Sequence, residues 1–88
     1  MIQEVKDYLK ITWDDEDNHI QGIIDRGKDY LNTLIGVELN FDNNESAKTL
    51  FLDYSRYAYN NALEYFEDNF QKEILRLQLM EAVKANEK

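Results

Sequence analysis

The sequence predicts an all-α protein built as a small bundle of three to four helices. It contains no proline and only three glycines in 88 residues, a composition typical of helical proteins with few tight turns. Apolar residues recur with a period near 3.6 along most of the chain. The hydrophobic share of 43%, with six tyrosines and four phenylalanines, is too high for a disordered acidic segment. We therefore expect a single helical domain over residues 1–88, with residues 84–88 frayed.

Two helices are expected in the first half of the chain. Ile2, Val5 and Leu9 have the spacing of a short helix with one apolar face. A longer helix follows, and its apolar face consists of Ile20, Ile23, Ile24, Gly27, Tyr30 or Leu31, and Leu34. Gly36 then stands where a left-handed glycine ends a helix. The position of Gly27 on the apolar face suggests that another helix approaches closely, although a tolerated glycine is the alternative.

The sequence of the second half of the chain predicts either one bent helix or two separate helices. The connector "VELNFDNNES" leads to a third helix, with Asp42 and Glu45 as its capping box. Its apolar face consists of Ala47, Leu50, Phe51, Tyr54, Ala58 and Ala62. The pair at residues 60–61 is its weakest point, because asparagine competes for backbone hydrogen bonds. Asp68 and Gln71 are spaced as a further capping box. The apolar residues of the fourth helix are Phe70, Ile74, Leu75, Leu77, Leu79, Ala82 and Val83.

Four consecutive acids, at residues 14–17 of the stretch "LKITWDDEDNHI", could belong to a metal site or to a helix start. A calcium loop needs glycine at its sixth position, and the two possible registers place His19 or Ile20 there. Thr12 as N-cap with Asp15 three residues later fits a capping box, and Asp14 would serve almost as well as the cap. The acids would then face the positive end of the helix dipole, so we interpret them as a helix start.

No catalytic, cofactor-binding or metal-binding residue is predicted. The chain has no cysteine, and its single histidine, His19, lies on an early turn of the second helix as a solvated side chain. A Gly-rich phosphate loop, a His-Glu-x-x-His motif and a serine elbow are all missing from the sequence. We therefore expect neither an enzyme nor a bound cofactor.

Aromatic residues supply the first candidates for a protein interface. Trp13 either plugs the core at the corner between two helices or anchors an interface. Tyr57 and Tyr59 are expected to point away from the core, and beside Arg56 they have the composition of a contact surface. Surface tyrosines with no role are the alternative.

The net charge of −8 limits the classes of partner. Ordinary nucleic-acid binding needs a Lys or Arg for each phosphate contact, and anionic membrane surfaces are disfavoured for the same reason. No apolar run approaches the roughly 20 residues that cross a bilayer, and the alternation of charged and apolar residues in "MIQEVKDYLK" is unlike a signal peptide.

The segments "VKDYLKITWDDEDNHIQGIIDRGKDYLNTLIG" and "AKTLFLDYSRYAYNNALEYFEDNFQKEIL" resemble the phage head–tail connector family. The resemblance extends from about Val5 to Leu79. It implies an all-helical adaptor, without cofactor or enzymatic activity, that forms a ring of about a dozen copies under the portal protein. Such a ring would extend the DNA channel, pass DNA without sequence-specific binding and dock a head-completion or tail protein. The implied location is the head–tail junction of the virion, and the host cytoplasm before assembly.

The same resemblance implies that docking uses the C-terminal segment and the loop between the two long helices. In this chain the loop lies around residues 38–44, which makes Glu38 and Asn40 further interface candidates. An alternative function is an acidic DNA mimic, or a prophage regulatory protein, that binds a DNA-binding partner.

Overall fold

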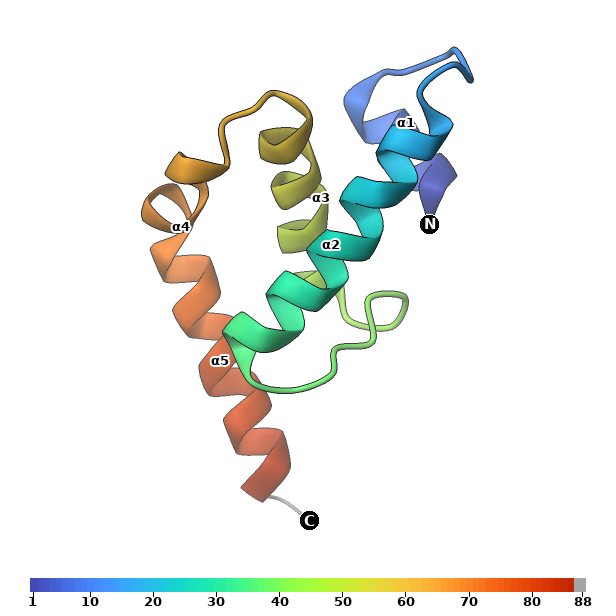
Figure 1. Ribbon diagram of the computed structural model, residues 1–88. Helices are drawn as coiled ribbons and strands as arrows, with labels where there is room; N and C mark the ends of the chain where they lie inside the picture. Colours follow the sequence, from blue (N-terminus) through green and yellow to red (C-terminus); the bar gives the residue numbers. More distant parts are fainter. Residues whose placement is uncertain (87–88) are drawn as a thin grey trace.

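Five α-helices and one short 3-10 helix make up the computed structural model, which describes residues 1–86 and is all-α as predicted (Figure 1). The elements are α1 (Ile2–Leu9), α2 (Asp17–Ile35), α3 (Glu45–Tyr59), η1 (Leu63–Tyr65), α4 (Phe66–Asn69) and α5 (Gln71–Asn86). The molecule measures 44 × 25 × 17 Å. None of the helices among these residues is long and apolar enough to cross a membrane.

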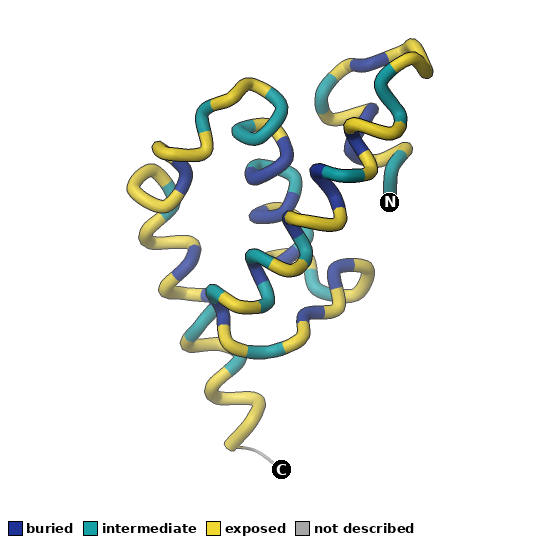
Figure 2. The backbone as a smooth tube through the Cα atoms, in the orientation of Figure 1, coloured by how far each residue is buried: buried dark blue, intermediate teal, exposed yellow. Residues whose placement is uncertain are grey.

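The core lies where α2 crosses α3, and α1 and α5 each cover part of it (Figure 2). Its buried apolar members are Val5, Ile11, Ile20, Ile23, Ile24, Leu31, Ile35, Leu39, Phe41, Ala47, Leu50, Phe51, Tyr54, Phe66, Ile74 and Leu77. They come from all five α-helices and from the loops that join α1 to α2 and α2 to α3. The domain therefore folds around one shared core, with the exposed surfaces of its loops and helix ends around it.

Gly27 permits the closest approach between α2 and α3. A Cβ atom at this position would lie 2.8 Å from Cε1 of Tyr54 and 3.0 Å from Cε1 of Phe51. These distances are shorter than ordinary carbon–carbon contacts, so only glycine fits without displacing an aromatic ring. The predicted close approach of another helix is confirmed.

The observed ends of the helices match those predicted from the sequence at some positions and differ at others. Gly36 ends α2 with φ of 94°, the left-handed conformation predicted for it. The capping box of Asp42 and Glu45 is wrong, because the N-cap of α3 is Asn44, whose Oδ1 accepts a hydrogen bond from the backbone N–H of Ala47 at 3.0 Å. The spacing of Asp42 and Glu45 fits a capping box, but the chain enters the helix two residues later.

The third and fourth predicted helices are separate rods. α3 ends at Tyr59, and Asn61 takes a left-handed conformation with φ of 56°, which confirms the weak point at residues 60–61. Asp68 lies inside the short α4, so its capping box with Gln71 is wrong. α5 continues through Asn86; residues 87–88 lie outside the described residues, and the fraying of residues 84–88 stays a prediction.

Substitution of Gly27 tests the packing of α2 against α3. We expect Gly27→Ala to lower the free energy of unfolding by about 1–3 kcal/mol, because the added methyl group overpacks the contact with Tyr54 and Phe51. Gly22 in the same helix is the matched control: its Cβ would meet only the flexible guanidinium of Arg26, 3.1 Å away at the nearest atom. Gly22→Ala should therefore be more stable than wild type by about 0.5–1 kcal/mol.

Urea unfolding followed by circular dichroism measures both values. A Gly27→Ala variant as stable as Gly22→Ala would show that α2 and α3 do not depend on this contact.

Candidate functional site

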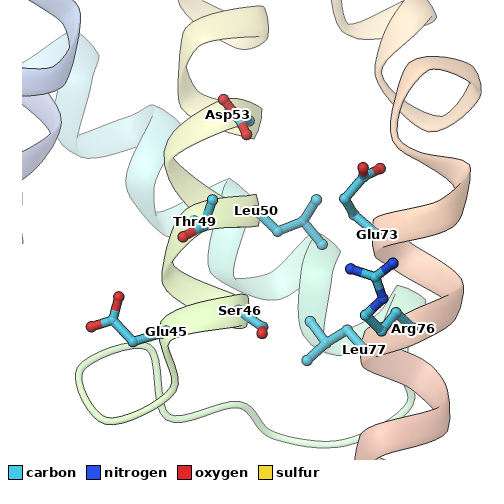
Figure 3. A pocket seen from close by; sticks show the side chains of 8 residues that line it. All are labelled: Glu45, Ser46, Thr49, Leu50, Asp53, Glu73, Arg76 and Leu77. Atoms are coloured by element: carbon cyan, nitrogen blue, oxygen red, sulfur yellow. The ribbon is translucent and has the colours of Figure 1, made fainter.

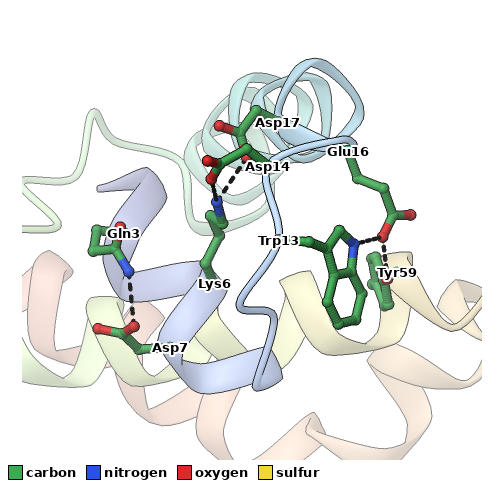
Figure 4. A network of polar contacts seen from close by, with 8 residues as sticks. All are labelled: Gln3, Lys6, Asp7, Trp13, Asp14, Glu16, Asp17 and Tyr59. Atoms are coloured by element: carbon green, nitrogen blue, oxygen red, sulfur yellow. Dashed lines mark hydrogen bonds and ion pairs between the residues drawn. The ribbon is translucent and has the colours of Figure 1, made fainter.

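The acidic corner, which we define as residues 10–17 between α1 and α2, is held by a buried lysine. The Lys6 side chain is only 6% exposed, and its Nζ donates hydrogen bonds to Oδ1 of Asp14 at 2.6 Å and Oδ1 of Asp17 at 2.8 Å (Figure 4). The hydrogen bond to Asp14 is the main reason why the pKa of Lys6 is raised, and the same bond lowers the pKa of Asp14. The two carboxylates thus pair with the charge of a lysine whose side chain is largely buried.

Glu16 is the third acid of this corner that forms hydrogen bonds, and its partners differ from those of Asp14 and Asp17. Its Oε2 accepts hydrogen bonds from Nε1 of Trp13 at 2.7 Å and from the hydroxyl of Tyr59 in α3 at 2.7 Å. Both bonds lower the pKa of Glu16, and the bond from Tyr59 has the larger effect. The bond to Glu16 likewise raises the pKa of Tyr59. The corner is thus tied to α3 as well as to α1.

The predicted capping box of Thr12 and Asp15 is wrong. α2 begins at Asp17, and its N-cap is Glu16, which makes no side-chain capping bond. Asp14 and Asp17 pair with Lys6 instead, and Glu16 accepts hydrogen bonds from two aromatic side chains. Sequence spacing allowed both arrangements, and only the folded position of Lys6 decides between them.

Trp13 lies on the surface of the corner rather than in the core. Its side chain is 45% exposed, so the core-plug alternative is wrong, while its indole N–H has found a partner in Glu16. An exposed indole beside the exposed carboxylates of Asp14 and Asp15 is a surface that combines apolar area with negative charge. Its use as an interface stays a prediction.

The three interface candidates on α3 are partly used inside the molecule. Tyr57 and Tyr59 are half-buried and pack against the core, so the expectation that they point away from it is corrected. The ring of Tyr57 meets Phe70 edge-on at 5.5 Å, and the guanidinium of exposed Arg56 lies 4.9 Å from the Tyr57 ring centre. Arg56 therefore offers the more accessible surface of the three.

The loop between α2 and α3 presents both of its candidate residues. Glu38 and Asn40 are exposed, whereas the alternate residues Leu39 and Phe41 are buried and anchor the loop. Oδ1 of Asn40 accepts the backbone N–H of residues 42 and 43 at 3.1 and 3.2 Å. The loop is thus an ordered projection whose shape is set by its own hydrogen bonds.

A surface that the sequence did not single out lies on α5. Only Ile74 and Leu77 of this helix are buried, whereas Leu75, Leu79 and Val83 are 56–59% exposed. The sequence predicted all five as apolar residues of one helix, without separating buried from exposed positions. The signal that separates them is the spacing: Leu75, Leu79 and Val83 follow one another at intervals of four and form their own row.

A groove runs between α3 and α5, and Figure 3 shows the side chains that line it. Leu50 and Leu77 form its apolar floor. Its polar lining consists of Glu45, Ser46, Thr49, Asp53, Glu73 and Arg76. Among residues 1–86 no group of three or more His, Cys, Asp or Glu side chains is arranged to hold a metal ion.

Comparison with known proteins gives one match. The sequence model of the family described as "Phage gp6-like head-tail connector protein" matches residues 1–85. No curated protein and no solved structure matches the chain. The matched range includes all of α1 to α4 and all but the last residue of α5.

Replacement of Lys6 tests the electrostatic role of the corner. In Lys6→Met the pKa of Asp14 should rise from its lowered position towards the ordinary value of 3.8, because its main hydrogen-bond partner is lost. A carboxyl group whose pKa is lower in the folded than in the unfolded state stabilises the fold at pH values above its unfolded-state pKa. That stabilisation disappears as pH falls through the folded-state pKa. The stability advantage of wild type over Lys6→Met should therefore shrink as pH falls below about 3.8.

Titration of the Asp14 carboxyl carbon by NMR measures this shift. The control is Lys10→Met, at the exposed end of the same helix, which should leave the pKa of Asp14 unchanged. An unchanged pKa in Lys6→Met would contradict the ion pair.

Proposed function

Because this chain belongs to the phage gp6-like head-tail connector family, we propose that it assembles as a ring under the portal protein, extends the DNA channel and docks the next head-completion or tail protein. The observation that carries this proposal is the extent of the match, residues 1–85 of 88. The match involves the whole helical domain rather than one motif. The chain then acts as a structural protein at the head–tail junction of the virion, made in the host cytoplasm.

The arrangement of exposed residues supports assembly through more than one surface. In a ring, each subunit uses one surface to meet a different surface of its neighbour, and further surfaces must remain for the portal and the next protein. This domain offers the acidic corner with Trp13, the loop with Glu38 and Asn40, and the exposed row on α5. They lie on separate parts of the fold, so they can be occupied at the same time.

The charge of the chain supports a passive role towards DNA. A net −8 per chain amounts to roughly −96 for a dozen copies, a strongly negative annulus. Acidic side chains that face the channel would repel the phosphate backbone. DNA would then pass without sequence-specific binding and without adhering to the wall.

The acidic DNA mimic is the less favoured function. Mimicry needs acids that are free and spaced like phosphates on one face. In this fold Asp14 and Asp17 pair with Lys6, and Glu16 accepts bonds from Trp13 and Tyr59. The most concentrated acids of the sequence therefore serve the chain's own structure.

Binding to the portal protein of the same phage is the direct test. We expect native mass spectrometry of the mixture to show a complex of one portal with a closed set of copies of this chain, and negative-stain images to show a ring beneath the portal. A free monomer in the absence of portal is compatible with the proposal, because the portal can template the ring. Failure of the chain to bind this portal would refute the proposal.

A further inference from the structure

The far half of α5 extends beyond the body of the domain, and the hydrogen bond from Asn44 Nδ2 to Glu81 Oε2 at 3.3 Å joins it to the start of α3. From Leu79 to Asn86 no residue is buried, and Figure 2 shows this part of the helix exposed on its outer turns. The helix is nevertheless continuous from Gln71. A regular helix with exposed leucine, methionine and valine side chains presents apolar area that another surface could cover.

Two parallel rows form the exposed face of α5. Leu75, Leu79 and Val83 follow one another at intervals of four, and so do Arg76, Met80 and Lys84 in the adjacent row. Arg76, Leu79, Met80, Val83 and Lys84 line one shallow hollow. We call the six residues of the two rows the α5 face. It combines an apolar strip with the positive charges of Arg76 and of Lys84, whose Nζ also pairs with Oε2 of Glu81 in the same helix at 3.0 Å.

Charge is divided unevenly between α5 and the rest of the chain. Residues 71–86 contain three basic and two acidic residues, a net +1, whereas residues 1–70 contain six basic and fifteen acidic residues, a net −9. The α5 face is therefore complementary in charge to the body of another copy of the same chain.

The acidic corner provides the matching chemistry on the body. Trp13 is 45% exposed, and the carboxylates of Asp14 and Asp15 beside it are also exposed. An indole accepts apolar side chains, a methionine sulfur and an arginine on its face. The carboxylate of Asp15 suits a lysine, whereas that of Asp14 already pairs with Lys6. The corner and the outer half of α5 lie at opposite ends of the molecule (Figure 1), so one copy cannot bring its own two surfaces together.

We propose that the α5 face of each copy docks on the acidic corner of a second copy, with Leu79, Met80 and Val83 against Trp13 and with Arg76 and Lys84 near Asp15. This inference rests on the proposed function, because it assigns the contact between neighbours in the ring. The contact is heterologous, with two different surfaces at opposite ends, as a closed cyclic assembly requires. A second copy is favoured as the occupant because both the apolar partner and the complementary charge are present on this chain.

Cross-linking between copies tests which surfaces meet. The natural chain has no cysteine, so a single introduced thiol reacts alone. We expect Val83→Cys chains mixed with Asp15→Cys chains in the presence of portal to give a dimer with a short bis-maleimide. Leu63→Cys, at an exposed leucine outside the α5 face, should give none with Asp15→Cys. Cross-links from Val83→Cys to the portal alone would overturn the proposal.

Substitution of Leu79 tests the contribution of the α5 face to assembly. Leu79→Glu should raise the concentration needed for ring formation on the portal by about tenfold or more, because it places a charge at the centre of the contact. The matched control is Leu63→Glu, also at an exposed leucine, and it should assemble as wild type does. Because Trp13 is the only tryptophan, its emission should shift to the blue when wild-type rings form.

The outcomes separate this inference from the function on which it rests. If wild type binds no portal, the proposed function fails and the inference fails with it. If wild-type rings form but Val83→Cys does not cross-link to Asp15→Cys, or if Leu79→Glu assembles normally with the helical content of wild type, only the docking of α5 on the corner is overturned.

Discussion

The fold depends on the contact between Gly27 of α2 and the rings of Tyr54 and Phe51 on α3. Because glycine leaves room for these rings, the buried faces of α2 and α3 come into close contact where the two helices cross. Tyr54 then stacks on Tyr30 at 5.3 Å between ring centres and meets Phe66 edge-on at 5.6 Å. Through Phe66 the aromatic contacts reach α4 and the start of α5, so the direction in which α5 leaves the body depends on the same crossing.

Tyrosine hydroxyls fix the outer elements on this core. Tyr59 donates to Glu16 at 2.7 Å and holds the acidic corner against α3, and Tyr30 of α2 donates to Glu67 of α4. Each bond joins a phenol attached to the packed helices to a carboxylate on a peripheral segment. In a chain with a net charge of −8, such bonds give carboxylates an internal role without an equal number of cations. The surfaces proposed for assembly are therefore held in place by the core.

The sequence predicted the all-α class, the helical faces around Ile20–Leu34 and the close approach at Gly27, because these follow from local periodicity and from the size of one side chain. It did not predict the caps of α2 and α3, since several polar residues near each helix start fit a cap equally well and the tertiary position of Lys6 selects among the acids. The exposed row on α5 was missed because periodicity reports that a face is apolar, not whether the fold covers it. The interface roles assigned to Glu38, Asn40 and Arg56 remain predictions.

In the proposed ring, each connector domain presents one acidic surface and one apolar, cationic helix at opposite ends, and these two surfaces meet between neighbouring copies. A cryo-electron microscopy reconstruction of the portal with this chain bound tests this contact most directly. We expect a closed ring in which density for the outer half of α5 lies against the Trp13 corner of the neighbouring copy. Copies that bind the portal singly, without touching one another, would contradict it.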